Sequence, residues 1–129
     1  MGKMTTALAL AISFMATAVA QTPQSLPEQP NSTVGYSSVQ EALSALQSRS
    51  GVNVSVVRGW RVFADEKALA IWSFSPETHP SHPTVVKRQV VPVGSGSEVR
   101  MNVLCEASKA ACDGIVREFA AMNGMSLGQ

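Results

Sequence analysis

Both histidines of the chain, His79 and His82, lie in the Pro-rich segment ETHPSHP, close to Glu77. Imidazole nitrogens are common ligands of zinc, copper and nickel. A structural zinc site uses four protein ligands and a catalytic one three, and the chain holds no third histidine. Each histidine precedes a proline, which favours extended backbone. The preferred interpretation is a stiff, solvated connecting arm, and a copper or zinc site at His79 and His82 is the alternative.

The residues that acid–base or nucleophilic chemistry requires do not occur in recognisable patterns. General-base catalysis on a serine or cysteine needs a nucleophile, a base and a third group that orients the base. The sequence contains no Gly-x-Ser-x-Gly elbow, no His-Glu-x-x-His pair, no phosphate loop and no dinucleotide fingerprint. The adjacent carboxylates Asp65 and Glu66 are typical of a turn. The sequence therefore predicts neither an enzyme nor a bound cofactor.

The two cysteines, Cys105 and Cys112, lie at the junction of a predicted strand and a predicted helix. Behind a secretion signal, an even number of cysteines favours a disulfide. A strand end and the first turns of the following helix can meet at the Cα separation of about 5.5 Å that a bridge needs. Two buried thiols that pack as small apolar groups are the alternative. A redox pair is disfavoured because its usual spacing is two intervening residues.

Lys87 and Arg88 form a charged pair inside an otherwise apolar strand, TVVKRQVVPV. Consecutive strand residues face opposite sides of a sheet, so one of the two is expected to point toward the helices or to lie at a sheet edge. Long cationic side chains often bury their stems and keep the charge in water. The alternative is that Lys87 and Arg88, together with His79 and His82, form a candidate partner surface that binds an acidic protein.

Two amphipathic helices are expected to frame the domain. Ser38 and Glu41 have the spacing of a capping box, and Gly51 supplies a stop after the apolar positions of the first helix. A second helix is predicted from about Ser108 to Met122, ended by Asn123-Gly124. Its predicted apolar face comprises Ala111 or Cys112, Ile115, Phe119 and Met122.

Five strands are predicted between these helices, because β-branched and aromatic residues dominate and turn signals separate them. The expected ranges are 52–57, 60–64, 69–74, 84–93 and 97–105. The last strand alternates apolar with polar residues, which indicates one wet and one covered face. We therefore predict an α+β fold with a roughly five-stranded antiparallel sheet and both helices packed on one face of it.

The N-terminal twenty residues have the three regions of a secretory signal peptide: Lys3, an apolar run and an Ala18-Val19-Ala20 ending. The apolar run is shorter than a bilayer requires, so no membrane insertion is expected after cleavage. Residues 21–34 are rich in Gln, Pro and Ser and are predicted to be a flexible linker, which leaves 35–129 as one domain. Without Lys3 the chain has nine Lys and Arg against nine Asp and Glu, a balance that argues against nucleic-acid binding.

Three segments, VGYSSVQEALSAL, WSFSPETHPSHPTVVKRQVV and VLCEASKAACDGIVREF, resemble parts of small exported proteobacterial proteins of unassigned function. The resemblance implies a Gram-negative exported protein whose usual destination is the periplasm. It implies no activity and no site residue.

Two functions follow as hypotheses. The first is a periplasmic or secreted binding or accessory protein that contacts a cell-envelope protein, with an inhibitor of a secreted hydrolase as one subclass. The second is a metal carrier or sensor that uses His79 and His82.

Overall fold

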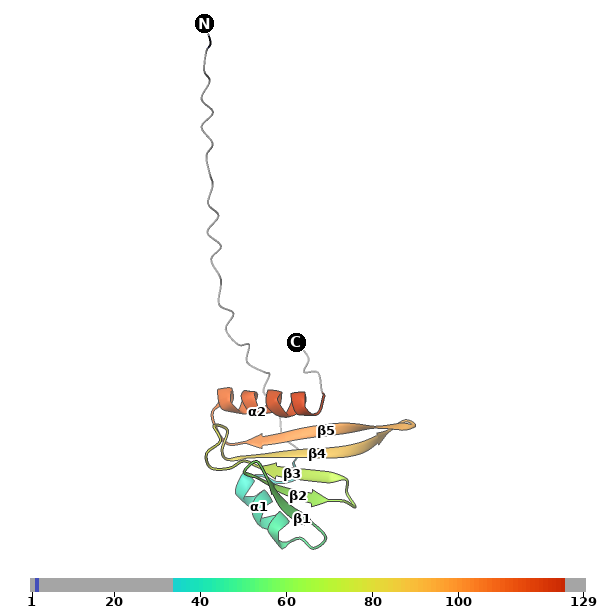
Figure 1. The fold of residues 1–129 in the computed structure, drawn as a ribbon. Helices are drawn as coiled ribbons and strands as arrows, with labels where there is room; N and C mark the ends of the chain where they lie inside the picture. The colour runs from blue at the N-terminus through green and yellow to red at the C-terminus, as the bar shows by residue number, and fades with distance from the viewer. Residues whose placement is uncertain (1, 3–33, 125–129) are drawn as a thin grey trace.

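The computed structural model describes residue 2 and residues 34–124 (Figure 1). The predicted signal peptide apart from Gly2, and the predicted linker apart from Val34, lie outside these residues. In the described part no helix is long and apolar enough to cross a membrane. The elements follow in the order α1 (Val39–Ser48), β1 (Asn53–Val57), β2 (Trp60–Asp65), β3 (Ala70–Phe74), β4 (Thr84–Val93), β5 (Gly96–Cys105) and α2 (Lys109–Met122).

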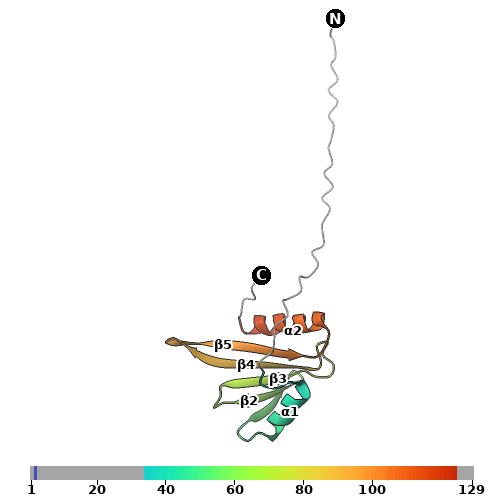
Figure 2. The same cartoon turned by 180° about the vertical axis from the view of Figure 1, so that it is seen from behind.

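The five strands form one antiparallel meander in the order β1-β2-β3-β4-β5. The α+β class and the five-stranded antiparallel sheet are therefore as predicted, and each strand begins and ends within two residues of its predicted range. β4 and β5 are each 10 residues long, twice the length of β3. Their hairpin consequently extends past the rest of the sheet (Figures 1 and 2).

Helix α1 begins where the sequence predicts, with one change in its capping hydrogen bonds. The Ser38 hydroxyl accepts the Glu41 amide at 3.0 Å, as in a capping box. The Glu41 carboxylate accepts hydrogen bonds from the Ser37 hydroxyl and, at 2.9 Å, from the Ser37 backbone amide. These bonds favour the ionised carboxylate and lower the pKa of Glu41 below its ordinary value of 4.5.

This hydrogen bonding predicts a specific pH dependence. A carboxyl with a lowered folded-state pKa contributes stability above its unfolded pKa, and the contribution is lost as the pH falls through the folded value. We expect an NMR titration of the Glu41 side-chain carboxyl to have a midpoint below 4.5, and the Ser37→Ala variant to move it upward. A midpoint that does not move in Ser37→Ala would contradict this assignment.

The first of two hydrophobic cores lies between α1 and one face of the sheet. Phe63 and Val85 are completely buried in it, and the Phe63 ring meets Phe74 edge-on at 5.4 Å between centroids. α1 contributes Val39, Ala42 and Leu46 to the same cluster. The strand register places these core residues on one face of the sheet. Phe63 lies opposite Trp72, and Phe74 lies opposite Val85.

The second core lies on the other face of the sheet, under α2. Ile115 and Phe119 of α2 pack there against Val86, with Trp60, Met101 and Val103 around them. The α2 face was predicted correctly at Ile115 and Phe119. It was wrong at Met122, which is 62% exposed, whereas Ala120 is buried.

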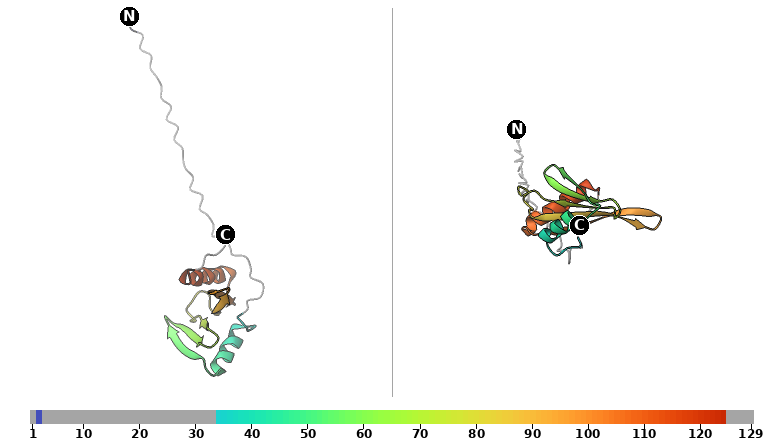
Figure 3. Two further views of the ribbon diagram at one scale, coloured as in Figure 1. Left: turned by 90° about the vertical axis from the view of Figure 1, so that its right-hand side faces the viewer. Right: turned by 90° about the horizontal axis from the view of Figure 1, so that it is seen from below.

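The prediction that both helices pack on one face is therefore wrong. Val85 belongs to the α1 core and its neighbour Val86 to the α2 core, and adjacent strand residues point to opposite faces. In the side view of Figure 3 the strands β4 and β5 lie between the two helices. Each face of the sheet is packed by a single helix, α1 on one side and α2 on the other, so each face is only partly covered.

The domain boundary also needs a correction of one residue. Val34, the last residue of the predicted linker, is 1% exposed and belongs to the α1 core. Its carbonyl oxygen accepts a hydrogen bond from Trp72 Nε1 at 3.3 Å. Buried indole N–H groups usually need such an acceptor, so Val34 is part of the folded domain.

Candidate functional site

The segment with the two histidines is a compact double turn and not an extended, solvated arm. The His79 amide donates to the Pro76 carbonyl and the His82 amide donates to the His79 carbonyl, each at 3.0 Å. Ser81, between the histidines, is completely buried. The prediction of a stiff solvated arm is thus wrong, because backbone turns and serine side chains fold the segment onto the domain.

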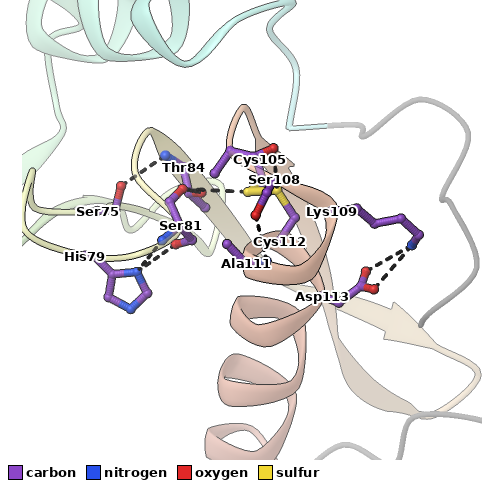
Figure 4. Close-up of a disulfide and its surroundings, with 11 residues drawn as sticks. Ser75, His79, Ser81, Thr84, Cys105, Ser108, Lys109, Ala111, Cys112 and Asp113 are labelled. Carbon is purple, nitrogen blue, oxygen red and sulfur yellow. Dashed lines mark hydrogen bonds and ion pairs between the residues drawn. A yellow bond between two sulfur atoms is a disulfide. The ribbon is translucent and has the colours of Figure 1, made fainter. Parts of the chain in front are cut away.

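The His79 ring contacts Ser81 of its own turn, Glu118 of α2 and Trp60 of β2. Its Nδ1 accepts the Ser81 amide at 3.1 Å and lies 2.8 Å from the Ser81 hydroxyl (Figure 4). Its Nε2 lies 3.6 Å from Glu118 Oε2, and the ring meets Trp60 edge-on at 5.1 Å. Because Nδ1 is an acceptor, the neutral ring carries its proton on Nε2.

The array Ser81–His79–Glu118 contains the residue types of a catalytic triad, but its serine is buried. Ser81 has a relative exposure of 0%, so its hydroxyl does not face solvent in this structure. Its carbonyl oxygen accepts a hydrogen bond from the Thr84 hydroxyl, and Cys105 Sγ lies 3.7 Å away. These contacts hold the turn against the start of β4, through Thr84, and against α2, through Glu118.

His82 is exposed and forms a separate set of contacts. Its Nδ1 lies 3.1 Å from the Ser75 carbonyl oxygen and 3.0 Å from the Ser75 hydroxyl. The bond to the carbonyl requires a proton on Nδ1, so His82 offers its free electron pair at Nε2. His79 has the opposite tautomer. Within the described residues no group of three His, Cys, Asp or Glu side chains is placed to hold a metal ion.

Cys105 and Cys112 are joined as a disulfide, with their Cα atoms 5.7 Å apart (Figure 4). The bond ties the end of β5 to the first turns of α2, where the Ser108 hydroxyl caps the helix by accepting the Ala111 amide. Next to it, the Glu106 carboxylate accepts the Val39 amide at 2.8 Å. The end of β5 therefore anchors α2 covalently and α1 by a hydrogen bond.

Lys87 and Arg88 point to opposite faces, and each meets an aromatic ring. Lys87 Nζ lies 5.4 Å from the centre of the Trp72 ring on the α1 side, and Arg88 Cζ lies 5.4 Å from the centre of the Phe119 ring on the α2 side. The four residues of the predicted partner surface therefore do not share one surface. One of the two cations was expected to point toward the helices or to lie at a sheet edge, and both point toward a helix because each face has its own helix.

The outer edge of β1 is the most open strand surface among the described residues. β1 pairs only with β2, and all five of its residues are exposed. Val54, Val56 and Val57 are 58%, 70% and 54% exposed. Natural edge strands are commonly protected by lysine, proline or a bulge, and the sequence NVSVV contains neither lysine nor proline.

Comparison with protein-family models, with curated proteins and with solved structures gives no match to this chain.

Proposed function

We propose that this chain is an exported binding module that captures an extended segment of a cell-envelope protein along the free edge of β1. The single observation that carries the proposal is that edge, an uncharged row of exposed β-branched residues. An added strand would satisfy the outward backbone N–H and C=O groups of β1, and its side chains would pack against the exposed valines. Strand addition of this kind gives affinity without a deep pocket.

Two cations beside β1 indicate that the partner segment carries negative charge. Arg58 lies in the β1–β2 turn and Arg61 lies opposite Val56 in the register. Both are exposed, and neither forms an ion pair within the described residues. We infer that the captured segment alternates apolar with polar residues and carries acidic side chains at the end that lies beside Val56 and Val57. Those acids would steer association and fix the register.

Export is supported by two features of the chain. The first is the signal-peptide pattern of the N-terminal twenty residues. The second is the Cys105–Cys112 pair, since disulfides persist in oxidising compartments. No observation favours the metal carrier, because His79 and His82 present opposite tautomers and are fixed by separate serines.

The proposal predicts the effect of a single charge on the edge. The Val56→Lys variant is expected to reduce capture of the partner from an oxidised envelope extract at least tenfold, because an edge lysine blocks strand addition. Val56 is 70% exposed, so the fold should tolerate the change. Captured proteins are quantified by mass spectrometry, and far-UV circular dichroism checks the fold.

The matched control is Val93→Lys, which places the same charge on another exposed valine, 47% exposed, at the tip of β4. It should capture as much partner as the unmodified protein. Equal capture by the Val56→Lys variant, or no specific partner in several extracts, would contradict the proposal.

A further inference from the structure

A groove of about 490 Å³ lies on the α2 side of the sheet, beyond the C-terminal end of that helix. Register places Ala64, Ile71 and Arg88 in one row across its floor, and Val90 lies opposite Val99 in the next row. Asn123, just after α2, lines one side, and the β2–β3 turn with Glu66 and Leu69 lines another. The volume is within the range of about 300–1,000 Å³ typical of ligand sites.

The floor of this groove is apolar and partly open to solvent. Ile71, Val90 and Val99 are 36%, 39% and 42% exposed. α2 ends before it covers them, because the β4–β5 hairpin is longer than the helix can shield (Figure 1). Apolar surface of this kind gains free energy when a ligand removes it from water.

Arg88 is the cation that lines the groove, and no carboxylate of the described residues forms an ion pair with it. Its guanidinium packs on the Phe119 ring, Nη1 lies 3.5 Å from Asn123 Oδ1, and buried Nε has no hydrogen-bond partner. Burial lowers the pKa of Arg88 from its ordinary value, yet an arginine stays charged at neutral pH.

The two acidic residues that line the groove, Asp65 and Glu66, form no ion pair with Arg88. Asp65 pairs with Arg49 at 3.6 Å and accepts the Ala68 amide. Glu66 accepts a hydrogen bond from the Asn53 side chain at 3.4 Å. Among residues 34–124, the partly desolvated Arg88 beside the apolar floor therefore has no carboxylate as an ion-pair partner.

We propose that this groove binds an amphiphile with one carboxylate and a linear apolar chain, such as a fatty acid. The carboxylate would meet the terminal guanidinium nitrogens of Arg88 end-on, because Nε is buried. The chain would lie over Ile71, Val90 and Val99. Arginine suits this role because its planar group matches a carboxylate and tolerates partial burial better than an ammonium. The site is on a different part of the sheet from the β1 edge and does not depend on it.

The test uses three probes with linear alkyl chains of similar length and different head groups: decanoate, decanol and decyltrimethylammonium, each below its critical micelle concentration or its solubility limit. Binding to the full chain is measured by calorimetry and by amide shifts in ¹⁵N–¹H NMR spectra. We expect decanoate to bind most tightly and to shift the amides of Ile71, Val90 and Val99.

Arg88→Met keeps an apolar stem and removes the charge. It should weaken decanoate binding at least tenfold and leave decanol binding within twofold of the unmodified protein. Arg88→Lys should recover only part of the loss. Arg100→Met is the matched control, because Arg100 is exposed and lies on the other face of the sheet, opposite Gln89. It should bind decanoate as the unmodified protein does.

A second variant keeps the test valid if Arg88→Met does not fold. Val99→Glu places a carboxylate at the exposed groove floor and should also weaken decanoate at least tenfold. The proposal is overturned if decanoate does not bind, if a folded Arg88→Met variant binds it equally, or if the shifted amides are those of β1. It is also overturned if the protein is a dimer that Arg88→Met dissociates, because a second copy would then occupy the groove.

Discussion

Replacing Phe63 by alanine should lower the free energy of unfolding by about 3–5 kcal/mol, the range for large aromatic deletions in a core. Phe63 is completely buried at the centre of the α1 core, and its ring contacts Phe74 edge-on. The sheet and α1 hold the surrounding side chains in place, so the site cannot collapse fully onto the vacated space. A domain of this size has a total stability of about 5–15 kcal/mol, so the loss is a large fraction of it.

Urea unfolding followed by circular dichroism measures this change. The control is Val56→Ala on the neighbouring strand, which faces the same side of the sheet but is 70% exposed. It should change stability by less than about 0.5 kcal/mol, as exposed substitutions usually do. A loss below about 1 kcal/mol for Phe63→Ala would show that Phe63 does not occupy the centre of a packed core.

The second large effect is expected from the disulfide. The cysteines are seven positions apart, and the chain-entropy relation gives about 2.5 kcal/mol for closing a loop of that length. Replacing both with alanine should lower the thermal unfolding midpoint by at least about 10 °C, since 1 kcal/mol shifts a small domain by about 4–8 °C. The start of α2, which the bridge holds to β5, should lose amide protection first.

Reductant supplies the control for this prediction. It should destabilise the unmodified protein by a similar amount and leave the double alanine variant unchanged. If reductant has no effect on the unmodified protein purified from an oxidising compartment, the two sulfurs are not bridged there.

Much of the secondary structure could be predicted, because the local signals were strong. Ser38 marks the start of α1. Runs of β-branched residues mark the strands, and the Arg58-Gly59 turn separates β1 from β2. Both turn residues have a positive φ, 50° for Arg58 and 84° for Gly59, as a two-residue hairpin turn requires.

The assignment of both helices to one face failed although the sequence held a signal against it. Thr84, Val85 and Val86 are consecutive and all buried, and such a run is typical of a strand covered on both faces. The alternating pattern of β5 indicated instead that only one face of the sheet is covered. That pattern describes the α2 face, whereas Leu104 packs on the α1 core.

The candidate sites could not be predicted from the sequence, because they depend on long-range placement. β1 is an edge strand only by virtue of the strand order, which local patterns do not determine. The groove combines the β2–β3 turn, the β4–β5 hairpin and Asn123, which lie far apart in the chain. The fixed histidines depend on Ser75 and Ser81, whose hydrogen bonds no spacing rule indicated.

The central claim, that β1 is the partner-binding edge, is tested most directly by site-specific photocrosslinking in the native host. A benzophenone amino acid is introduced at position 56, and in a parallel strain at position 93. We predict one abundant, discrete adduct from position 56 and none from position 93. No adduct from position 56, or the same adducts from both positions, would contradict the claim.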